Sequence, residues 1–413
     1  MKLVYKYCLK SINIYIKINF IIIFSILIFQ RSKIANKIKA LKENNHYYKE
    51  RNNKKNKEIK NYRYYHKRIK ENNITFKSNK EKNLIKKRKR KVGIIGLTHH
   101  KNVGNNLLKF AIYIQLKKLG LEPYIIGKHK IDEDIRFLNR TTHPRIIKNF
   151  NEIKKKDYDI LMVNSDQTWR KWSSDFYNIA FLKFSRNWDV PKFIYGASTG
   201  LDYWPFSKEI DKIAKYLLKN FTGISFREMS TVKYAKEHLG LNSTFVLDPT
   251  MLIDKKYYME IINNYKNNNN LSNLKDYILI YKLDKMRNME SFIKRVQYQL
   301  KYKILNIKLN DNDYIEKFLH GIFHSKAVIT NSYHATLFAI IFNKPFVVFL
   351  NKYRGIERFK TIKEIYGIKD RFINILQKPN LSLLAIPLKI NYTSINFYRK
   401  ISIEYLKKHL NII

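Results

Sequence analysis

Short apolar runs alternate with longer segments of helical periodicity along most of the chain. The runs are rich in β-branched residues and end at small or polar ones, which is typical of strands buried on both faces of a parallel sheet. Between two such runs, residues 107–119 repeat apolar positions at helical spacing, and Gly120 ends this predicted helix. Strands are predicted at residues 92–96, 123–126, 160–163, 192–195, 223–226, 244–247, 277–281, 304–307, 327–329 and 346–350. This alternation predicts an α/β protein with parallel sheets.

An asparagine-rich loop at residues 263–273 divides these elements into two sets. The first set begins with a strand, a turn, a helix and a second strand, which resembles the start of a doubly wound domain. We therefore predict two Rossmann-like domains, residues 91–265 and 274–385, with a cleft between them. Residues 386–413 are predicted to form a C-terminal helix that packs across the pair.

The first 90 residues have a different pattern. Residues 1–30 contain an apolar run at 18–29, which is shorter than the roughly 20 residues that span a bilayer. A spanning anchor, an interfacial helix, an amphipathic helix on the main body and a cleaved signal peptide remain open, and we favour a hydrophobic membrane-associating segment. Residues 31–90 are rich in Lys and Arg and lack glycine and proline, which predicts a polybasic spacer, either a solvated helix or disordered, that binds an anionic membrane surface. The positive-inside rule then places the rest of the chain in the cytoplasm, at the inner face of the plasma membrane.

The formal net charge of +48 raises the alternative of nucleic-acid binding. Basic residues are spread along the whole chain, and Lys, Asn, Ile and Tyr are abundant throughout, as in the product of an AT-rich coding sequence. A nucleic-acid partner is therefore unlikely, although the run Lys86-Lys87-Arg88-Lys89-Arg90-Lys91 remains a candidate patch. The single cysteine, Cys8, excludes a disulfide framework and a cysteine-based metal cluster and fits a reducing compartment, and we predict no metal site.

One histidine lies where an α/β sheet is expected to bind a ligand. The predicted strand at 327–329 ends in Thr330-Asn331-Ser332, and His334 follows in the first turn of the next helix. The carboxyl ends of parallel strands form the ligand sites of open α/β sheets, and a helix N-terminus offers free N–H groups to an anion. This placement predicts an acid/base histidine beside an anionic substrate.

Other polar residues follow strands of the first predicted domain. Asp166 either caps the next helix or orients a substrate hydroxyl. Arg227, beside Glu228, forms either an exposed ion pair or a fork for phosphate or carboxylate at the cleft. The small residues at 196–200 suit an ordinary turn or the close approach of a ligand, and Asp248-Pro249-Thr250 closes the last strand. Their shared position at strand ends favours a site in the cleft.

Taken in order, a set of short segments resembles the polysaccharide pyruvyl transferase family. The resemblance implies two Rossmann-like domains in a GT-B-like arrangement, behind a basic N-terminal extension. It also implies transfer of a pyruvyl (carboxyethylidene) group from phosphoenolpyruvate to a sugar diol of a cell-surface polysaccharide or its precursor, forming a ketal, with no metal or organic cofactor. The segments, between about residues 91 and 372, are Thr98-His99 through Asn102, Gly104 and Asn105; Ser165-Asp166-Gln167 with Trp169; Tyr195-Gly196-Ala197-Ser198; Ser225 with Arg227-Glu228; Asp248-Pro249-Thr250; Ser332-Tyr333-His334-Ala335-Thr336; and Arg358-Phe359 followed by Gly367-Ile368 and Asp370-Arg371.

The resemblance also implies roles for individual residues. His334 would be the general acid that protonates the methylene carbon of phosphoenolpyruvate, and it could also serve as the base for the attacking hydroxyl. Asp166 would join it as a catalytic residue. Arg227, Arg358 and Ser332 would bind the donor, although Arg358 is equally well explained as a surface cation.

On the acceptor side, Asn105, Gly104 and Gln167 would face the sugar, which is a glycan or a lipid-linked glycan. Two positions depart from the family pattern. Relatives in one branch carry arginine where this chain has Ser332, and many relatives carry aspartate at the position of Asn331. The donor contacts of this chain are therefore expected to differ from theirs.

Two functions of other classes remain open. A GT-B glycosyltransferase that uses a nucleotide sugar would share the fold and would place Arg and His near a diphosphate, although no acidic pair suited to a nucleotide ribose is found near the second domain. A basic protein that binds an anionic polymer would instead bind through residues 31–90, with a steep dependence on salt.

Overall fold

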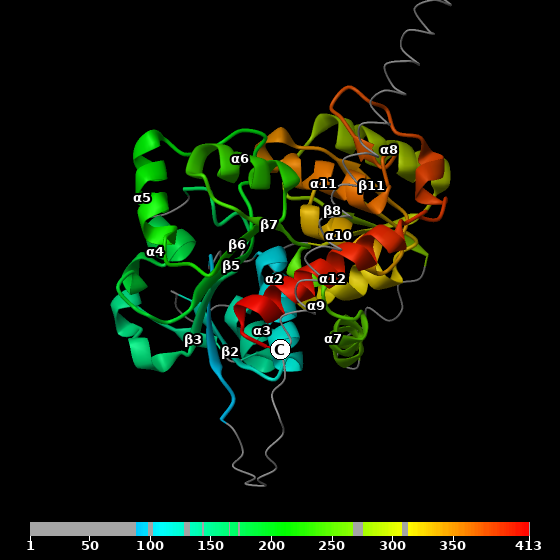
Figure 1. Ribbon diagram of the computed structural model, residues 1–413. Coiled ribbons are helices and arrows are strands. Elements are labelled where there is room, and N and C mark those ends of the chain that lie inside the picture. Colours follow the sequence, from blue (N-terminus) through cyan, green and yellow to red (C-terminus); the bar gives the residue numbers. More distant parts are fainter. Residues whose placement is uncertain are drawn as a thin grey trace, which may run out of the picture. The chain divides into compact units, whose positions relative to one another are not determined.

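Two parallel β-sheets form the framework of the protein in the computed structural model (Figure 1). The structure describes residues 88–97, 102–127, 133–142, 144–164, 166–171, 174–266, 276–307 and 313–412. The predictions for residues 1–30, and for the 31–90 spacer apart from its last three residues, lie outside this part. Within the described residues, no helix is both long and apolar enough to cross a membrane.

The first sheet has seven strands in the order β3-β2-β1-β4-β5-β6-β7. All neighbouring strands are parallel. This is the strand order of the dinucleotide-binding Rossmann fold with one further strand, and the order reverses between β1 and β4. The strands are β1 (Lys91–Ile95), β2 (Glu122–Gly127), β3 (Pro144–Ile146), β4 (Ile160–Val163), β5 (Lys192–Ala197), β6 (Gly223–Phe226) and β7 (Thr244–Phe245).

The second sheet has five strands in the order β12-β11-β10-β8-β9, and these are also parallel. Counted along the chain from β8, this is the order of flavodoxin-like sheets, and it reverses between β8 and β10. The strands are β8 (Tyr277–Tyr281), β9 (Lys303–Asn306), β10 (Ala327–Thr330), β11 (Phe346–Phe349) and β12 (Phe372–Ile373).

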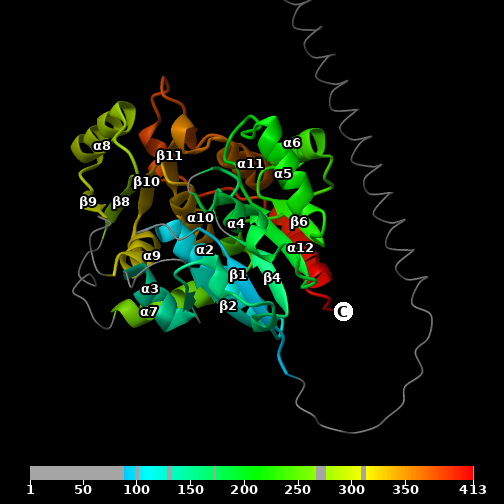
Figure 2. The same ribbon diagram turned by 90° about the vertical axis from the view of Figure 1, so that its left-hand side faces the viewer.

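Helices connect the strands and cover the sheets, and α2 lies beside α9 and α10 in both views (Figures 1 and 2). Short 3₁₀ segments include η4 (Pro249–Met251), η6 (Lys352–Arg354) and η7 (Leu381–Leu384). The α-helices are α2 (Val103–Lys118), α3 (Glu133–Thr141), α4 (Phe176–Phe181), α5 (Lys208–Leu218), α6 (Met229–Leu239), α7 (Lys256–Lys266), α8 (Arg287–Leu300), α9 (Tyr314–His324), α10 (Tyr333–Ile341), α11 (Glu357–Tyr366) and α12 (Tyr392–His409).

The predicted fold class is confirmed, with two Rossmann-like α/β halves that each contain a parallel sheet. The sequence pattern does not predict β3 and β12, because edge strands of three and two residues are too short to show a periodicity. β7 ends at Phe245, two residues earlier than predicted, where the chain leaves the sheet toward Asp248. The predicted domain limits stay a prediction.

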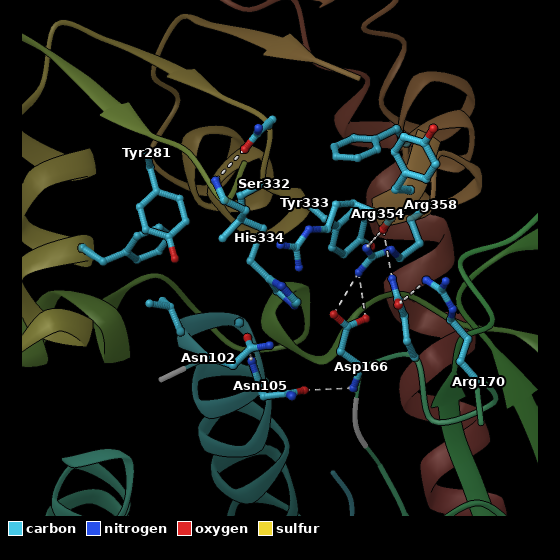
Figure 3. Close-up of a pocket in the computed structure, with 18 residues that line it drawn as sticks. Asn102, Asn105, Asp166, Arg170, Tyr281, Ser332, Tyr333, His334, Arg354 and Arg358 are labelled. Atoms are coloured by element: carbon cyan, nitrogen blue, oxygen red, sulfur yellow. Dashed lines mark hydrogen bonds and ion pairs between the residues drawn. The ribbon is translucent and has the colours of Figure 1, made fainter. Parts of the chain in front are cut away.

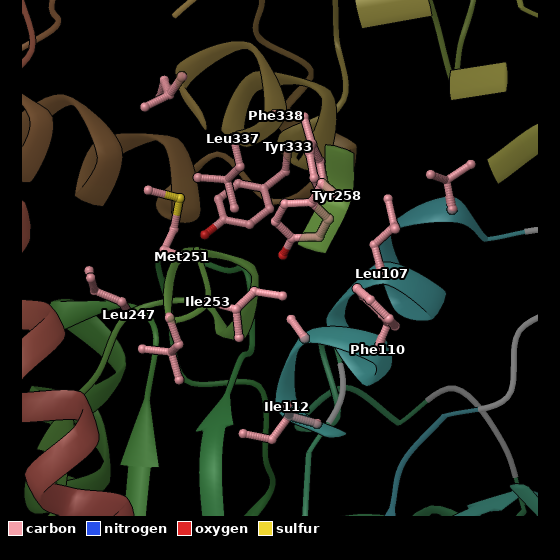
Figure 4. Close-up of a cluster of buried hydrophobic side chains, with 14 of the residues drawn as sticks. Leu107, Phe110, Ile112, Leu247, Met251, Ile253, Tyr258, Tyr333, Leu337 and Phe338 are labelled. Carbon is pink, nitrogen blue, oxygen red and sulfur yellow. The ribbon is translucent and has the colours of Figure 1, made fainter. Parts of the chain in front are cut away.

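One hydrophobic core extends through both halves (Figure 4). Leu107 and Phe110 of α2 belong to it together with Tyr258 of α7 and Phe338 of α10. The ring of Tyr258 lies 6.1 Å from that of Phe110 and 4.9 Å from that of Phe338, so it joins helices of the two halves. Because α2 follows β1 and α10 follows β10, this core holds the two points of strand reversal close together.

The C-terminal helix α12 also connects the halves. Its side chains bond to the first sheet, where Tyr405 donates to the carbonyl of Ile194 at 2.8 Å and Ser402 accepts from the amide of Leu247 at 2.9 Å. At its N-terminal end, the amide of Asn391 donates to the carbonyl of Tyr366, the last residue of α11. The helix therefore spans from the second half to the first.

Truncation of the shared core should destabilise the protein. The Phe338 side chain is fully buried, so Phe338→Ala should lower the free energy of unfolding by about 3–5 kcal/mol. The matched control is Phe397→Ala on α12, because the Phe397 side chain is 57% exposed and its loss should change stability little. Urea titration followed by circular dichroism measures both variants, and equal effects of the two would contradict a core that joins the halves.

Candidate functional site

A cavity of about 580 Å³ lies where the strand reversals of the two sheets meet (Figure 3). The first half contributes the start of α2, which follows β1, and Asp166, which follows β4. The second half contributes Tyr281 at the end of β8 and Ser332 to His334 after β10. Seven of the eight predicted site residues line the cavity, and the eighth, Arg227, lies behind its wall. The structure therefore brings the predicted residues together at one cavity, whereas their roles and the function of the cavity stay predictions.

His334 is held by the turn between β10 and α10. Thr330 donates to the carbonyl of Tyr281 at 2.6 Å and accepts from the amide of Ser332 at 2.9 Å. Ser332 is the N-cap of α10, and its hydroxyl accepts from the amide of Ala335. His334 is consequently the second residue of the helix and is only 5% exposed.

Gly104 lies directly against the imidazole ring of His334. A methyl group on Gly104 would overlap the ring, with Nδ1 as the nearest atom. Gly104 belongs to the first turn of α2, which is capped by Asn102. The position thus requires a glycine because the histidine occupies the space of its side chain, which is a structural reason besides the predicted contact with an acceptor.

A row of alternating charges runs from His334 across the back of the cavity. Asp248 Oδ2 lies 3.7 Å from His334 Nε2, which is too long for a hydrogen bond but close enough for electrostatic attraction. Arg227 donates to Asp248 from Nη1 and to Asp166 from Nη2, the latter at 2.5 Å. Arg358 then donates to both carboxylate oxygens of Asp166, at 2.8 and 2.9 Å.

Burial and mutual attraction set the charge states in this row. Burial by itself would raise the pKa values of Asp166 and Asp248, but the arginines lower both well below the usual range. The two carboxylates in turn raise the pKa of Arg227 despite its burial. All three groups are therefore held in their charged forms at neutral pH, and Asp166 is a poor base toward a substrate hydroxyl.

Tyr333 packs between this row and α11. Its ring centroid lies 4.7 Å from the guanidinium carbon of Arg358 and 5.6 Å from that of Arg227, which are favourable distances for cation–π contacts. Burial raises the pKa of the Tyr333 hydroxyl well above its usual value, so it stays protonated. The Nε atoms of Arg227 and Arg358 are buried and have no hydrogen-bond partner among the described residues.

Gln167 and Asn105 border the cavity on the side of the first sheet. Asn105 accepts from the amide of Asp166 at 3.1 Å and so fixes the loop after β4. Gln167 has a φ of 45°, and its side chain donates to the carbonyl of Arg354 across the cavity and accepts from Arg170. These two of the three predicted acceptor residues therefore lie at the cavity and also hold neighbouring loops in place.

The two positions that depart from the family pattern have structural contacts in this chain. Ser332 caps α10, as described above. Asn331 accepts from the amide of Leu283 at 2.7 Å and donates to the carbonyl of Asp284 at 2.9 Å, which ties the end of β10 to the end of β8. Asn331 can make both bonds because an amide side chain donates and accepts, whereas a charged aspartate only accepts.

Asp248 is the member of the charged row to which sequence reasoning gave no role. Its carboxylate is fixed by Thr250, which donates from both its amide and its hydroxyl, and by Arg227. The sequence signal was the polar turn at the end of the last strand, but β7 and β10 lie in different sheets, so the contact with His334 could not be foreseen. Within the described residues, no group of three or more His, Cys, Asp or Glu side chains is placed to hold a metal ion.

Comparisons with known proteins give one family match and several distant structural similarities. The model of the family described as polysaccharide pyruvyl transferase matches residues 102–353, more than half of the chain. No curated protein matches the chain significantly. Similar solved structures include a UDP-GlcNAc 2-epimerase from Neisseria meningitidis bound to UDP-GlcNAc, with 10% identity and a TM-score of 0.47 over 78% of this chain and 99% of that one. The S. aureus MnaA–UDP structure has 14% identity and a TM-score of 0.44 over 79% and 98% of the two chains.

The depressed pKa values of Asp166 and Asp248 predict an acid-sensitive fold. Their stabilising contribution is complete above the unfolded pKa of about 4 and is lost as the pH falls toward the lower folded values. Asp248→Asn should lower the unfolding free energy at pH 7 by about 3–5 kcal/mol, because Arg227 loses one buried partner. It should also flatten the decline of stability below pH 5.

Urea titrations at a series of pH values measure this effect. The control is Asp189→Asn, because Asp189 forms an exposed ion pair with Lys155 whose loss should change stability little. An acid decline in Asp248→Asn as steep as in the unaltered protein would show that this carboxylate does not couple the fold to pH.

Proposed function

Because the chain belongs to the polysaccharide pyruvyl transferase family, we propose that it transfers a pyruvyl group from phosphoenolpyruvate to a sugar diol of a cell-surface polysaccharide or its precursor, forming a ketal. The family makes the chain a transferase, and the donor and the ketal product are the proposal. The observation that supports it best is the buried row of His334, Asp248, Arg227, Asp166 and Arg358. The row combines a group that can move a proton with two guanidinium groups that can bind anions.

The arginines suit the donor. Phosphoenolpyruvate carries a phosphate and a carboxylate, and arginine binds both groups through paired N–H donors. Arg358 lines the cavity, and its Nε and that of Arg227 lack a partner among the described residues, so an incoming anion could satisfy donors that are now unused. We propose that the donor anion competes with Asp166 for these guanidinium groups.

The histidine suits the chemistry. Protonation of the methylene carbon of the donor produces a methyl group and an oxocarbenium-like centre at the neighbouring carbon, which a sugar hydroxyl can attack. His334 would give this proton, and the charged carboxylate of Asp248, 3.7 Å from Nε2, would stabilise the ring while it holds one. His334 would then take the proton of the attacking hydroxyl.

The second half of the reaction closes the ketal. The carbon–oxygen bond to phosphate breaks, and the second sugar hydroxyl attacks the same carbon. The diol loses two hydroxyl protons. One returns to His334, which gave its own proton to the methylene carbon, and the other leaves with phosphate, so atoms and charges balance. Asp166 stays ionised and can accept a hydrogen bond from an acceptor hydroxyl beside Asn105 and Gln167, which orients the diol without removing its protons.

The test combines product analysis with substitution of the histidine. The full chain is incubated with phosphoenolpyruvate and a panel of glycosides, and phosphate release is followed together with mass spectrometry of the sugars. A carboxyethylidene adduct is expected, and in D₂O its methyl group should carry one deuterium from the protonation step. His334→Ala should lower kcat by about 10²–10⁴-fold and should recover part of it with added imidazole.

The outcomes separate the parts of the proposal. An adduct formed at full rate by His334→Ala would remove the histidine from the mechanism while keeping the transferase. If no adduct forms and a nucleotide sugar is turned over, the donor is a nucleotide sugar and not phosphoenolpyruvate.

Gly104→Ala tests the placement of His334 without removing it. The added methyl group must push the imidazole aside, so kcat should fall by at least about tenfold while the KM for phosphoenolpyruvate changes little. The control is Gly321→Ala in α9, another helical glycine, where the added methyl group meets mainly the flexible end of Ile307. The prediction fails if both variants keep the same kcat, or if Gly104→Ala changes only stability.

A further inference from the structure

A second cavity of about 1010 Å³ opens at the carboxyl edge of the second sheet. Its walls come from the start of α8, from residues 350–353 after β11 and from the loop 374–379 after β12. α8 and β11 lie side by side in both ribbon views (Figures 1 and 2). Tyr353 lines this cavity and also the cavity that holds His334, so the two are neighbours.

The charged residues of this second cavity are all cations. No carboxylate lines the cavity beside them, and none of these five cations forms an ion pair with a described residue. Two carboxylates close to these cations in the sequence already have partners, because Asp284 binds Arg354 and Glu290 binds Lys282. The five cations are Lys285, Arg287, Arg295, Lys352 and Lys378.

Charge alone does not single out a site in a chain with 81 Lys and Arg against 33 Asp and Glu. The exposed apolar residues at the rim of this cavity distinguish it from other basic parts of the surface. Leu376 is 93% exposed and is the most exposed large apolar side chain of the described residues, and its neighbour Ile375 is 71% exposed. Two adjacent aliphatic side chains in water are unfavourable, and in combination with a basic surround they are typical of a surface that meets a membrane.

The loop that holds this pair is fixed by hydrogen bonds. The amide of Gln377 donates to the carbonyl of Asn374 at 3.0 Å, and the Gln377 side chain accepts from the amide of Asn374 at 2.9 Å. Asn288 at the start of α8 donates to the carbonyls of Asn374 and Ile375 at 3.5 and 3.4 Å. Ile375 and Leu376 are thus held outward by the backbone rather than folded onto the sheet.

We propose that this cavity and its rim are a docking surface for an anionic lipid membrane. Lipid phosphates bind the five cations, and Ile375 and Leu376 enter the boundary between headgroups and acyl chains. A free phosphate or another small soluble anion would satisfy the cations but would leave both aliphatic side chains in water, so a lipid surface fits both features. This surface belongs to the folded part of the chain and is separate from the predicted attachment through residues 1–90.

A probe on the loop itself tests insertion. In the full chain with Cys8→Ser, Leu376→Cys is labelled with an environment-sensitive fluorophore and mixed with vesicles of phosphatidylglycerol and phosphatidylcholine in equal parts. The emission should shift to the blue with these vesicles and stay unchanged with phosphatidylcholine alone. The same label at Tyr298→Cys, an 83% exposed position elsewhere on α8, should report water in both cases.

Sedimentation with the same vesicles tests the cations. Arg287→Glu, Arg295→Glu and Lys378→Glu together should lower binding by at least about tenfold, since each basic residue near an anionic surface strengthens attachment. The control replaces three exposed lysines of α5, Lys208, Lys212 and Lys215, by glutamate, which changes the net charge equally.

Three results would overturn the proposal. The first is a label at position 376 that reports water while the protein sediments with the anionic vesicles. The second is an equal loss of binding in the α5 control. The third is a blue shift of the same size with phosphatidylcholine alone, which would deny the role of the lipid phosphates. None of these results bears on the donor or on the ketal product.

Discussion

The site depends on one buried guanidinium group, that of Arg227. Removing a charged arginine from water is costly unless carboxylates surround it, and here Asp248 and Asp166 do so. These three residues follow β6, β7 and β4, so a single charge network joins three strand ends of the first sheet. The two carboxylates then reach residues of the second sheet, because Asp248 faces His334 and Asp166 binds Arg358. The requirement that buried charges be paired therefore fixes the arginines and brings a carboxylate to face the histidine.

Apolar packing provides the rigidity that this network needs. A histidine two residues into α10 and a glycine in the first turn of α2 can touch only if both helices are fixed, and the shared core beneath them supplies that constraint. Opposite charges attract over several ångströms, so their attraction tolerates small shifts in position. The close contact between Gly104 and the imidazole does not tolerate such shifts. The core thus determines where the ring lies, and the charges determine which protonation states its neighbours adopt.

Sequence reasoning predicted the fold class, and it named seven of the residues that line the cavity. Those predictions rested on local patterns, namely apolar runs, turns and polar residues at strand ends, and such patterns survive into the structure. The sequence could not show that Asp248 faces His334, that Gly104 touches the same ring, or that Ser332 caps α10. The first two contacts join residues from different halves of the protein. In the third, the Ser332 hydroxyl is already used to cap the helix, whereas the sequence predicted that it binds the donor. Such contacts depend on tertiary packing, which no local pattern encodes.

The departures from the family pattern acquire a physical meaning in this setting. With a serine at 332, no arginine enters the cavity from the start of α10. Of the two arginines proposed to bind the donor, Arg358 lines the cavity and Arg227 lies behind its wall, and both are already bound to Asp166. A donor must therefore displace part of an existing ion pair, which favours a ligand with two anionic groups over one with a single charge. If the folded part also docks on anionic lipid beside Tyr353, a membrane-borne acceptor would reach this cavity from the side of the second sheet, opposite Asn105 and Asp166.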